Sequence, residues 1–164
     1  MLVKLAVLAV ACTTVLAGSA EARPTNRFIT LGQSIGSVRL GMTQAQVRQI
    51  LGPGTPLGSP YNHRLTVNYP KPGLYVQYGD GKAVGIVTSN PAYTTTKGIG
   101  VGRSTEAEVQ GAYPAAQCLS SNGNYSCELK GASVGPGIAR FTAFACSQDG
   151  QHDVVSIAVG YGKA

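Results

Sequence analysis

The chain has 164 residues, of which 43% are hydrophobic and 12% are charged, and its formal net charge is +6. This length fits one domain of ordinary size, and low charge combined with high hydrophobicity excludes a chain that is disordered throughout. The 22 glycines and 9 prolines predict many turns, whereas 3 phenylalanines and the absence of tryptophan predict a core of small side chains.

Residues 1–22 have the pattern of a cleavable secretory signal peptide. Lys4 supplies a positive charge before an apolar run at residues 5–16, and an A-x-A cleavage site closes the segment at Ala22. The run is shorter than the ~20 apolar residues that a membrane-spanning helix needs. We therefore expect export to the periplasm, the cell envelope or the medium, with cleavage near Ala22 and no transmembrane span.

The alternative for this segment is a lipoprotein signal that anchors the chain at Cys12. Residues 9–12 read Ala-Val-Ala-Cys, which is a poor lipobox, and the apolar run before the cysteine is at the short end of the usual range. We expect the cleaved, unanchored form.

Positive charge is concentrated in the first half of the exported chain. Residues 23–79 contain no Asp or Glu, and their basic residues are Arg23, Arg27, Arg39, Arg48, Arg64 and Lys71. Such a one-signed region attracts anionic surfaces, which outside the cytoplasm are phospholipid headgroups, cell-wall polymers or acidic protein faces. Nucleic acid is not an expected partner, because the basic residues are not clustered and the chain is expected to be exported.

A short helix is predicted to begin after Thr43. Thr43 and Gln46 have the spacing of a capping box. Apolar residues at helical spacing follow, and a Gly-Pro pair ends the helix: Val47, Ile50, Leu51, Gly52 and Pro53. A β-like stretch at residues 35–40 precedes it.

The same pattern recurs 62 residues later. Thr105 and Glu108 repeat the capping box, Val109 repeats the apolar stripe, and Pro114 repeats the stop. We interpret this as a tandem duplication, with a first helix-plus-sheet repeat at residues 23–95 and a second at residues 96–164.

Segments with period-two alternation follow each helix. They lie at residues 65–69, 74–78 and 82–87 in the first copy, and at 115–121, 125–129, 139–146 and 154–160 in the second. The glycine-rich residues 131–137 are expected to form a loop. The predicted fold class is therefore α+β, with two tandem copies of a short helix packed on an antiparallel sheet.

Three cysteines remain after export: Cys118, Cys127 and Cys146. The Asn-Gly pair at residues 122–123 predicts a two-residue hairpin loop that places Cys118 opposite Cys127, with Cα atoms ~4.5 Å apart. An exported chain meets oxidising conditions, so we predict this disulfide and a free Cys146. The alternative is a bond from Cys146 across an adjacent strand. We expect no metal site, because Cys-x-x-Cys spacing is absent and no histidine lies close in sequence to Cys118 or Cys127.

The first helix segment resembles the helix signature of the SmpA/OmlA (BamE-type) superfamily. The residues that carry the resemblance are Gly41, Met42, Thr43, Gln46, Val47, Leu51, Gly52 and Pro53. The duplicated form resembles the fold of the secreted beta-lactamase-inhibitor protein. The resemblance implies an envelope protein that binds other proteins or phospholipid and is not an enzyme. BamE-type members are lipoproteins, a feature that the poor lipobox here does not match.

The sequence offers little for catalysis. It contains neither a nucleophile elbow nor a phosphate-binding loop, and both histidines of the exported chain, His63 and His152, are expected in surface loops. We therefore expect no catalytic residue, no cofactor and no enzyme activity. A hydrolase that uses His152 is the remaining catalytic alternative.

Tyrosines crowd the first copy, and tyrosine is enriched at protein interfaces. On the sheet face opposite the helix we expect Thr66, Asn68, Tyr75, Gln77 and Val87. Arg39, Arg48 and Arg64 are expected to flank this face. The leading hypothesis is a binding module for another protein. The alternative is a binder of an anionic phospholipid or cell-wall surface through the basic first half.

Overall fold

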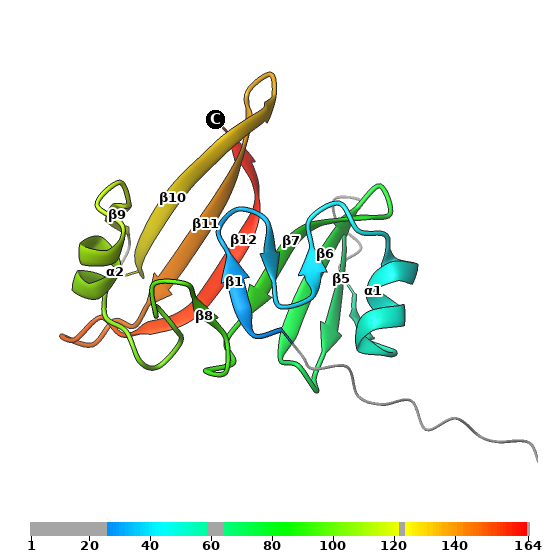
Figure 1. Ribbon diagram of the computed structural model, residues 1–164, viewed down its shortest axis with the longest axis horizontal. Helices are drawn as coiled ribbons and strands as arrows, with labels where there is room; N and C mark the ends of the chain where they lie inside the picture. The colour runs from blue at the N-terminus through cyan, green and yellow to red at the C-terminus, as the bar shows by residue number, and fades with distance from the viewer. Residues whose placement is uncertain (1–25, 59–63, 122–123, 164) are drawn as a thin grey trace, which may run out of the picture.

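The computed structural model describes residues 26–58, 64–121 and 124–163. Within these residues β-structure dominates, with twelve strands in two sheets and two short helices (Figure 1). The predicted signal peptide and Cys12 lie outside the described residues. None of the described helices has the length and apolar character needed to cross a membrane.

The larger sheet has eight strands in the order β4-β5-β6-β7-β12-β11-β10-β9, and every neighbouring pair is antiparallel. Its strands are β4 (Thr55–Leu57), β5 (Arg64–Tyr69), β6 (Leu74–Gly79), β7 (Lys82–Thr88), β9 (Gln117–Ser121), β10 (Asn124–Gly135), β11 (Ile138–Cys146) and β12 (Val154–Lys163). Strands β7 and β12 pair at the middle of the sheet. The strands that follow each helix therefore form one continuous sheet.

The smaller sheet has four strands in the order β3-β2-β1-β8. They are β1 (Phe28–Thr30), β2 (Ser34–Ile35), β3 (Val38–Arg39) and β8 (Thr94–Thr95). Strand β8 pairs parallel with β1. The β-like stretch expected at residues 35–40 is divided between two strands, because the chain turns at Gly36, whose φ is +61° and whose backbone approaches the Asn26 carbonyl.

Both helices begin where the capping boxes predict. In α1 (Gln44–Leu51) the Thr43 hydroxyl accepts from the Gln46 N–H, and the Gln46 side chain accepts from the Thr43 N–H. In α2 (Glu106–Ala112), Thr105 and Glu108 make the same reciprocal pair. Each helix is only about two turns long, so it depends on one buried valine to dock against the sheet.

The two helices and the small sheet cover one face of the large sheet. Figure 1 shows α1 beside β5 and β6, α2 beside β9 and β10, and β1 with β8 between them. The core lies between these layers. Its largest fully buried side chains include Tyr69, Phe144, Ile29, Ile35, Leu74, Ile86 and Ile157. We call this side of the large sheet the covered face.

The predicted α+β class, with two tandem copies of a short helix packed on an antiparallel sheet, is wrong. The molecule is mostly β, its large sheet runs unbroken through the β7–β12 pairing, and four short strands occupy space on the covered face where only helices were expected. Period-two alternation specifies which face of a strand is buried, but it does not specify the partner strand. The duplication and its boundary at residue 95 remain predictions.

A long hairpin projects from one end of the large sheet (Figure 1). Strand β10 continues to Gly135, so the glycine-rich segment predicted as a loop is largely strand. Its pairing with β11 shifts register between Lys130 and Ser133, and again between Ser133 and Gly135. The glycines of this segment lie at or next to irregularities of the strand pairing, where glycine within a strand is common.

Candidate functional site

In the described part of the chain, no helix or strand lies on the other face of the large sheet, here called the open face. This face carries four of the predicted contact residues as a compact block. Thr66 lies directly opposite Gln77, and Asn68 lies directly opposite Tyr75, on strands β5 and β6. Directly opposed side chains in an antiparallel pair are ~4.5–5.5 Å apart at Cβ. Tyr75 is 37% exposed, although a tyrosine in a core position would be almost fully buried.

Small side chains continue the open face across the middle of the sheet. Following the register from β6 through β7, β12 and β11 gives Gly85, Val87, Ala158, Gly160, Ser156, Ala143 and Ala145. These residues project little above the backbone. Gly85 and Gly160 are buried, because the Gln77 and Phe141 side chains lie over them. The accessible centre of the open face is therefore a floor of small side chains that are partly buried, and it consists of Ala143, Ala145, Ser156 and Ala158.

Larger side chains return at the far end of the open face. Phe141 lies against Gly160, where a Cβ atom would come within 2.9 Å of its ring. Glu128 and Lys130 of β10 follow by register, and Leu119 on the edge strand β9 is 70% exposed. Aromatic and amide side chains at one end and charged and apolar ones at the other thus flank the small floor.

The three arginines expected to flank this block do not all lie beside it. Arg39 is exposed on β3 and Arg48 is exposed on α1, and both elements belong to the layer on the covered face. Arg64 is the first residue of β5, where its backbone pairs with Gly79. The structure therefore separates Arg39 and Arg48 from Tyr75 by the thickness of the sheet.

The motif residues at positions 41–53 hold the first helix in place. The Gly41 N–H donates to the Ala83 carbonyl at 2.8 Å, and the Ala83 N–H donates to the Met42 carbonyl at 2.7 Å. Gly41 has a φ of +86°, which favours glycine. Val47 is fully buried. This part of the motif docks α1 onto β7 and has a structural role.

The end of the motif borders a small pocket of about 190 Å³. Leu51, Gly52 and Pro53 line one side of it, and residues 69–72 line the other. Gly52 ends the helix with a φ of +83°. Tyr69, which lines the pocket, has its hydroxyl 3.0 Å from that of Tyr78, and burial, followed by this hydrogen bond, raises the pKa of Tyr78.

The predicted disulfide between Cys118 and Cys127 is confirmed. The two residues are directly opposed on β9 and β10, with Cα atoms 3.9 Å apart. The loop residues 122 and 123 lie outside the described residues, but the register on either side is the one that a two-residue loop predicts. Cys146 is free and buried. Burial, and then the nearby carboxylates of Glu106 and Asp153, raise the pKa of its thiol to about 11.

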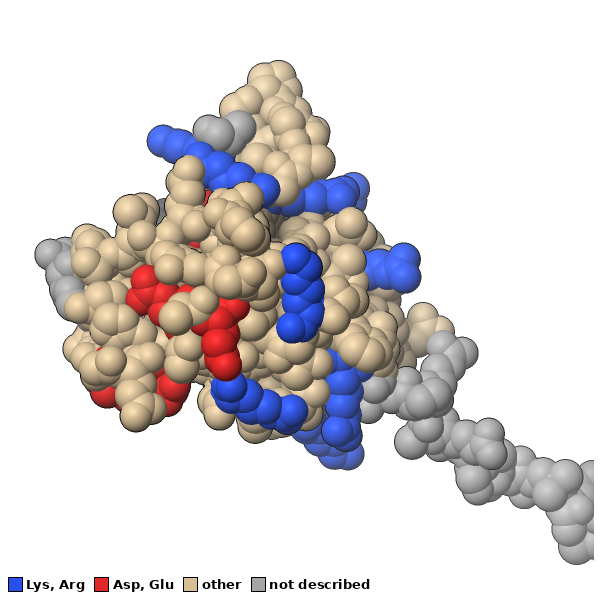
Figure 2. Space-filling view, turned by 60° about the vertical axis from the view of Figure 1, so that its left-hand side comes forward, with Lys and Arg blue, Asp and Glu red and all other residues tan. Residues whose placement is uncertain are grey.

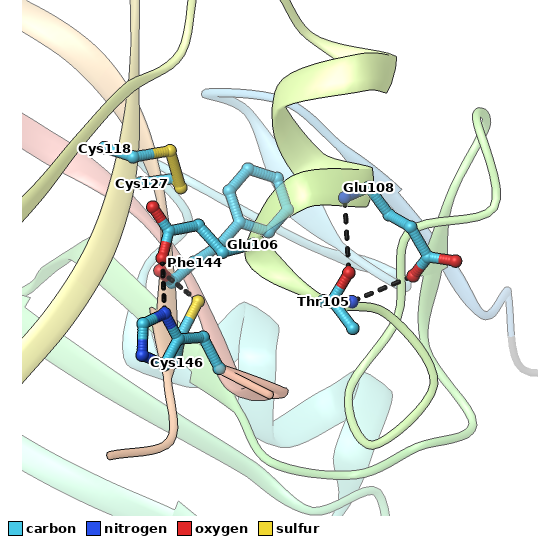
Figure 3. Close-up of a disulfide and its surroundings, with 8 residues drawn as sticks. Thr105, Glu106, Glu108, Cys118, Cys127, Phe144 and Cys146 are labelled. Carbon is cyan, nitrogen blue, oxygen red and sulfur yellow. Dashed lines mark hydrogen bonds and ion pairs between the residues drawn. A yellow bond between two sulfur atoms is a disulfide. The ribbon is translucent and has the colours of Figure 1, made fainter. Parts of the chain in front are cut away.

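A cluster that sequence reasoning missed lies beside this disulfide. His152, in the connection between β11 and β12, has its Nδ1 atom 3.0 Å from Oε2 of Glu106, the first residue of α2. The Tyr125 ring stacks on the imidazole with centroids 3.8 Å apart. Figure 3 shows the Glu106 carboxylate turned toward the disulfide. His152 and Glu106 are 46 residues apart, so no local sequence pattern could have predicted their contact.

The His152 backbone is also unusual, because its φ is +49°. Few residues other than glycine adopt this region, although histidine does so more often than most. The His152 carbonyl accepts from the Glu106 N–H at 3.1 Å, and Thr105 forms a β-bridge with Asp153. These backbone contacts fix the start of α2 against the connection that carries His152.

The comparisons with known proteins return one solved structure. The chain is similar to an extracellular protein containing a SCP domain from Bacillus anthracis str. Ames, with 10% identity and a TM-score of 0.51. The match covers 92% of this chain and 50% of that chain, so this chain spans about half the length of that protein. No family model and no curated protein matches the sequence. At this identity, the likeness concerns the fold alone.

Proposed function

We propose that the protein is an exported, non-catalytic module that binds another protein through the open face of its large sheet. The observation that carries the proposal is the arrangement of that face. The Thr66, Asn68, Tyr75 and Gln77 block lies at one end of a floor of small side chains. An uncovered sheet face would normally carry long polar side chains toward water, so a floor of alanine and serine side chains favours contact with a partner.

The side-chain sizes favour a projecting loop of a folded partner. Ala143, Ala145 and Ala158 are only partly buried and have short side chains, so they allow close approach at the centre. Tyr75 offers a rigid aromatic surface with a hydroxyl at its tip, a combination enriched at protein interfaces. Glu128 and Lys130 at the far end supply charges of both signs, which would set the orientation of the partner.

Export is supported by three features. Residues 1–22 have the composition of a signal peptide, and the Cys118–Cys127 disulfide is of the kind that persists in oxidising compartments. The resemblance of residues 41–53 to the SmpA/OmlA superfamily, and of the duplicated form to the beta-lactamase-inhibitor protein, supports a BamE-like or inhibitor-like envelope module.

A second candidate function is binding to an anionic envelope surface. Arg27, Arg39 and Arg48 are exposed, and they belong to the small sheet and α1 or lie next to them. In Figure 2 the acidic side chains gather on one side of the view, whereas Lys and Arg side chains spread over the rest. This candidate uses the layer opposite the open face, so the two functions make different predictions.

Site-specific photo-crosslinking tests the proposal. A benzophenone amino acid replaces Gln77 on the open face, and in a matched control it replaces Gln49, which is exposed on α1. After irradiation in envelope extract, the proposal predicts a discrete adduct from position 77 that the Tyr75→Ala substitution suppresses. Equal adducts from both positions, or an adduct indifferent to Tyr75→Ala, would contradict it.

Vesicle binding tests the second candidate. Vesicles containing phosphatidylglycerol would bind the protein at low salt and release it as salt rises past ~0.15 M, because screening shortens the reach of the charges. The Arg39→Ala/Arg48→Ala variant would bind less, and the Gln77→Ala variant would bind as the wild type does. Equal binding to neutral vesicles would eliminate this candidate.

A further inference from the structure

We propose that reduction of the Cys118–Cys127 disulfide creates a zinc-binding site from the two cysteine thiolates and the Glu106 carboxylate. The three ligand atoms, one from each residue, all lie within 4.8 Å of one another. The proposal concerns the covered face and does not depend on what the open face binds.

The disulfide holds the two sulfurs too close together for both to bind one tetrahedral zinc ion, so the site forms only after reduction. With Zn–S distances of ~2.3 Å and Zn–O distances of ~2.0–2.2 Å, the sulfurs of such a site are about 3.8 Å apart and each lies about 3.5 Å from the oxygen. Once the disulfide is open, rotation about the cysteine side-chain bonds brings the two sulfurs to this spacing. The carboxylate is already beside them (Figure 3).

The fold holds the three ligands together independently of the disulfide. Cys118 and Cys127 remain neighbours through the ladder of β9 and β10. The Glu106 N–H donates to the His152 carbonyl, and the bridge between Thr105 and Asp153 fixes the turn before α2. The reduced protein would therefore present a largely formed donor set, and ordering the ligands would cost little free energy.

His152 acts as the positioning residue of the site. Its Nδ1 lies 3.0 Å from Oε2 of Glu106, and the stacked Tyr125 ring fixes the imidazole plane. A hydrogen-bonded carboxylate keeps its orientation toward a metal, and loss of such a partner typically weakens metal binding about 10–100-fold. The side chains of Glu106 and His152 are 25% and 29% exposed, which leaves a path for the ion and for a water molecule as fourth ligand.

The zinc site forms in two steps, reduction of the disulfide and then binding of the ion. A dithiol reductant transfers two electrons and two protons to the Cys118–Cys127 disulfide, which becomes two thiols, while the reductant becomes a cyclic disulfide. Zn²⁺ then displaces one proton from each thiol and binds both thiolates together with Glu106. Two sulfur donors and one oxygen donor select zinc over the hard cations magnesium and calcium. The oxidised protein lacks thiolates at this position, so redox state controls occupancy.

Cobalt absorption tests the site, because Co²⁺ bound to thiolates gives a charge-transfer band. The full chain is titrated with Co²⁺ in its oxidised form and after reduction with a phosphine that does not bind metals. We expect one Co²⁺ per reduced chain, displaced by Zn²⁺, and no band in the oxidised chain. Cys146→Ser should retain the band, whereas Cys118→Ser/Cys127→Ser should lose it.

Two carboxylate variants separate this site from binding by any two thiols. Glu106→Gln should weaken binding at least about tenfold, whereas Glu108→Gln, which can still cap α2, should not weaken it. Equal affinity of these two variants, or no binding to reduced wild type, would overturn the proposal. If reduction loosens the fold, Zn²⁺ should still raise the melting temperature of the reduced chain and not that of the oxidised chain, and no such rise would also overturn it.

Discussion

Reduction of the Cys118–Cys127 disulfide should destabilise the protein by an amount that follows from the length of the loop it closes. The two cysteines are 9 residues apart in sequence. In the chain-entropy model, a loop of this size removes enough freedom from the unfolded chain to stabilise the folded state by about 2.6 kcal/mol at 25 °C. For a domain of this length, this corresponds to a fall in melting temperature of about 10 °C.

The assay is urea unfolding of the wild type with and without reductant, followed by far-UV circular dichroism. A metal chelator is present throughout, so that metal binding cannot compensate for the lost bond. Cys146→Ala is the matched control, because it changes a buried cysteine that forms no disulfide, and its oxidised and reduced forms should differ by the same ~2.6 kcal/mol. Identical unfolding curves for oxidised and reduced wild type would refute the reasoning.

Three further predictions concern stability. Burial raises the pKa of the Cys146 thiol from 9.0 to about 11. The contribution of this thiol to stability is therefore complete below about pH 9 and is lost as the pH rises to about 11. In urea unfolding across this pH range, the free energy of unfolding of Cys146→Ala should fall less than that of the wild type. Gly111→Ala should stabilise the protein by about 0.5–1 kcal/mol, because Gly111 is helical and a Cβ there meets nothing within 4 Å. Gly54→Ala should destabilise it by about 1–3 kcal/mol, because its Cβ would lie 2.5 Å from a buried valine. Thermal melts of both variants check that the two changes in stability have opposite signs. Tyr69→Phe should cost about 1–2 kcal/mol in urea unfolding, because it leaves the buried Tyr78 hydroxyl without its partner.

The elements that sequence could predict are those fixed by neighbouring residues. Both helix starts follow from capping boxes whose partners are three residues apart, as at Thr43 and Gln46. The opposition of Cys118 and Cys127 follows from a short hairpin. Alternation along β5 and β6 was enough to place Thr66, Asn68, Tyr75 and Gln77 on one face.

The arrangement of these elements depends on contacts between distant residues, which local patterns do not encode. The pairing of Val87 with Ala158 joins a strand near the middle of the chain to the last strand, and it produces the single large sheet. The parallel pair of β1 and β8 joins segments more than 60 residues apart. We expected Arg39 and Arg48 beside the open face, but they lie on β3 and α1, in the layer on the covered face. The position of that layer could not be inferred from local patterns.

The most direct test of the central claim is to block the open face at its centre. Ala143 lies on β11 opposite Ala158 and Glu128, and its side chain is directed away from the core, so Ala143→Arg should leave the melting temperature nearly unchanged. Photo-crosslinking from position 77 should fall at least about tenfold in this variant, because a long charged side chain then occupies the small floor. A folded Ala143→Arg protein that crosslinks as efficiently as the wild type would contradict the assignment of this face as the binding surface.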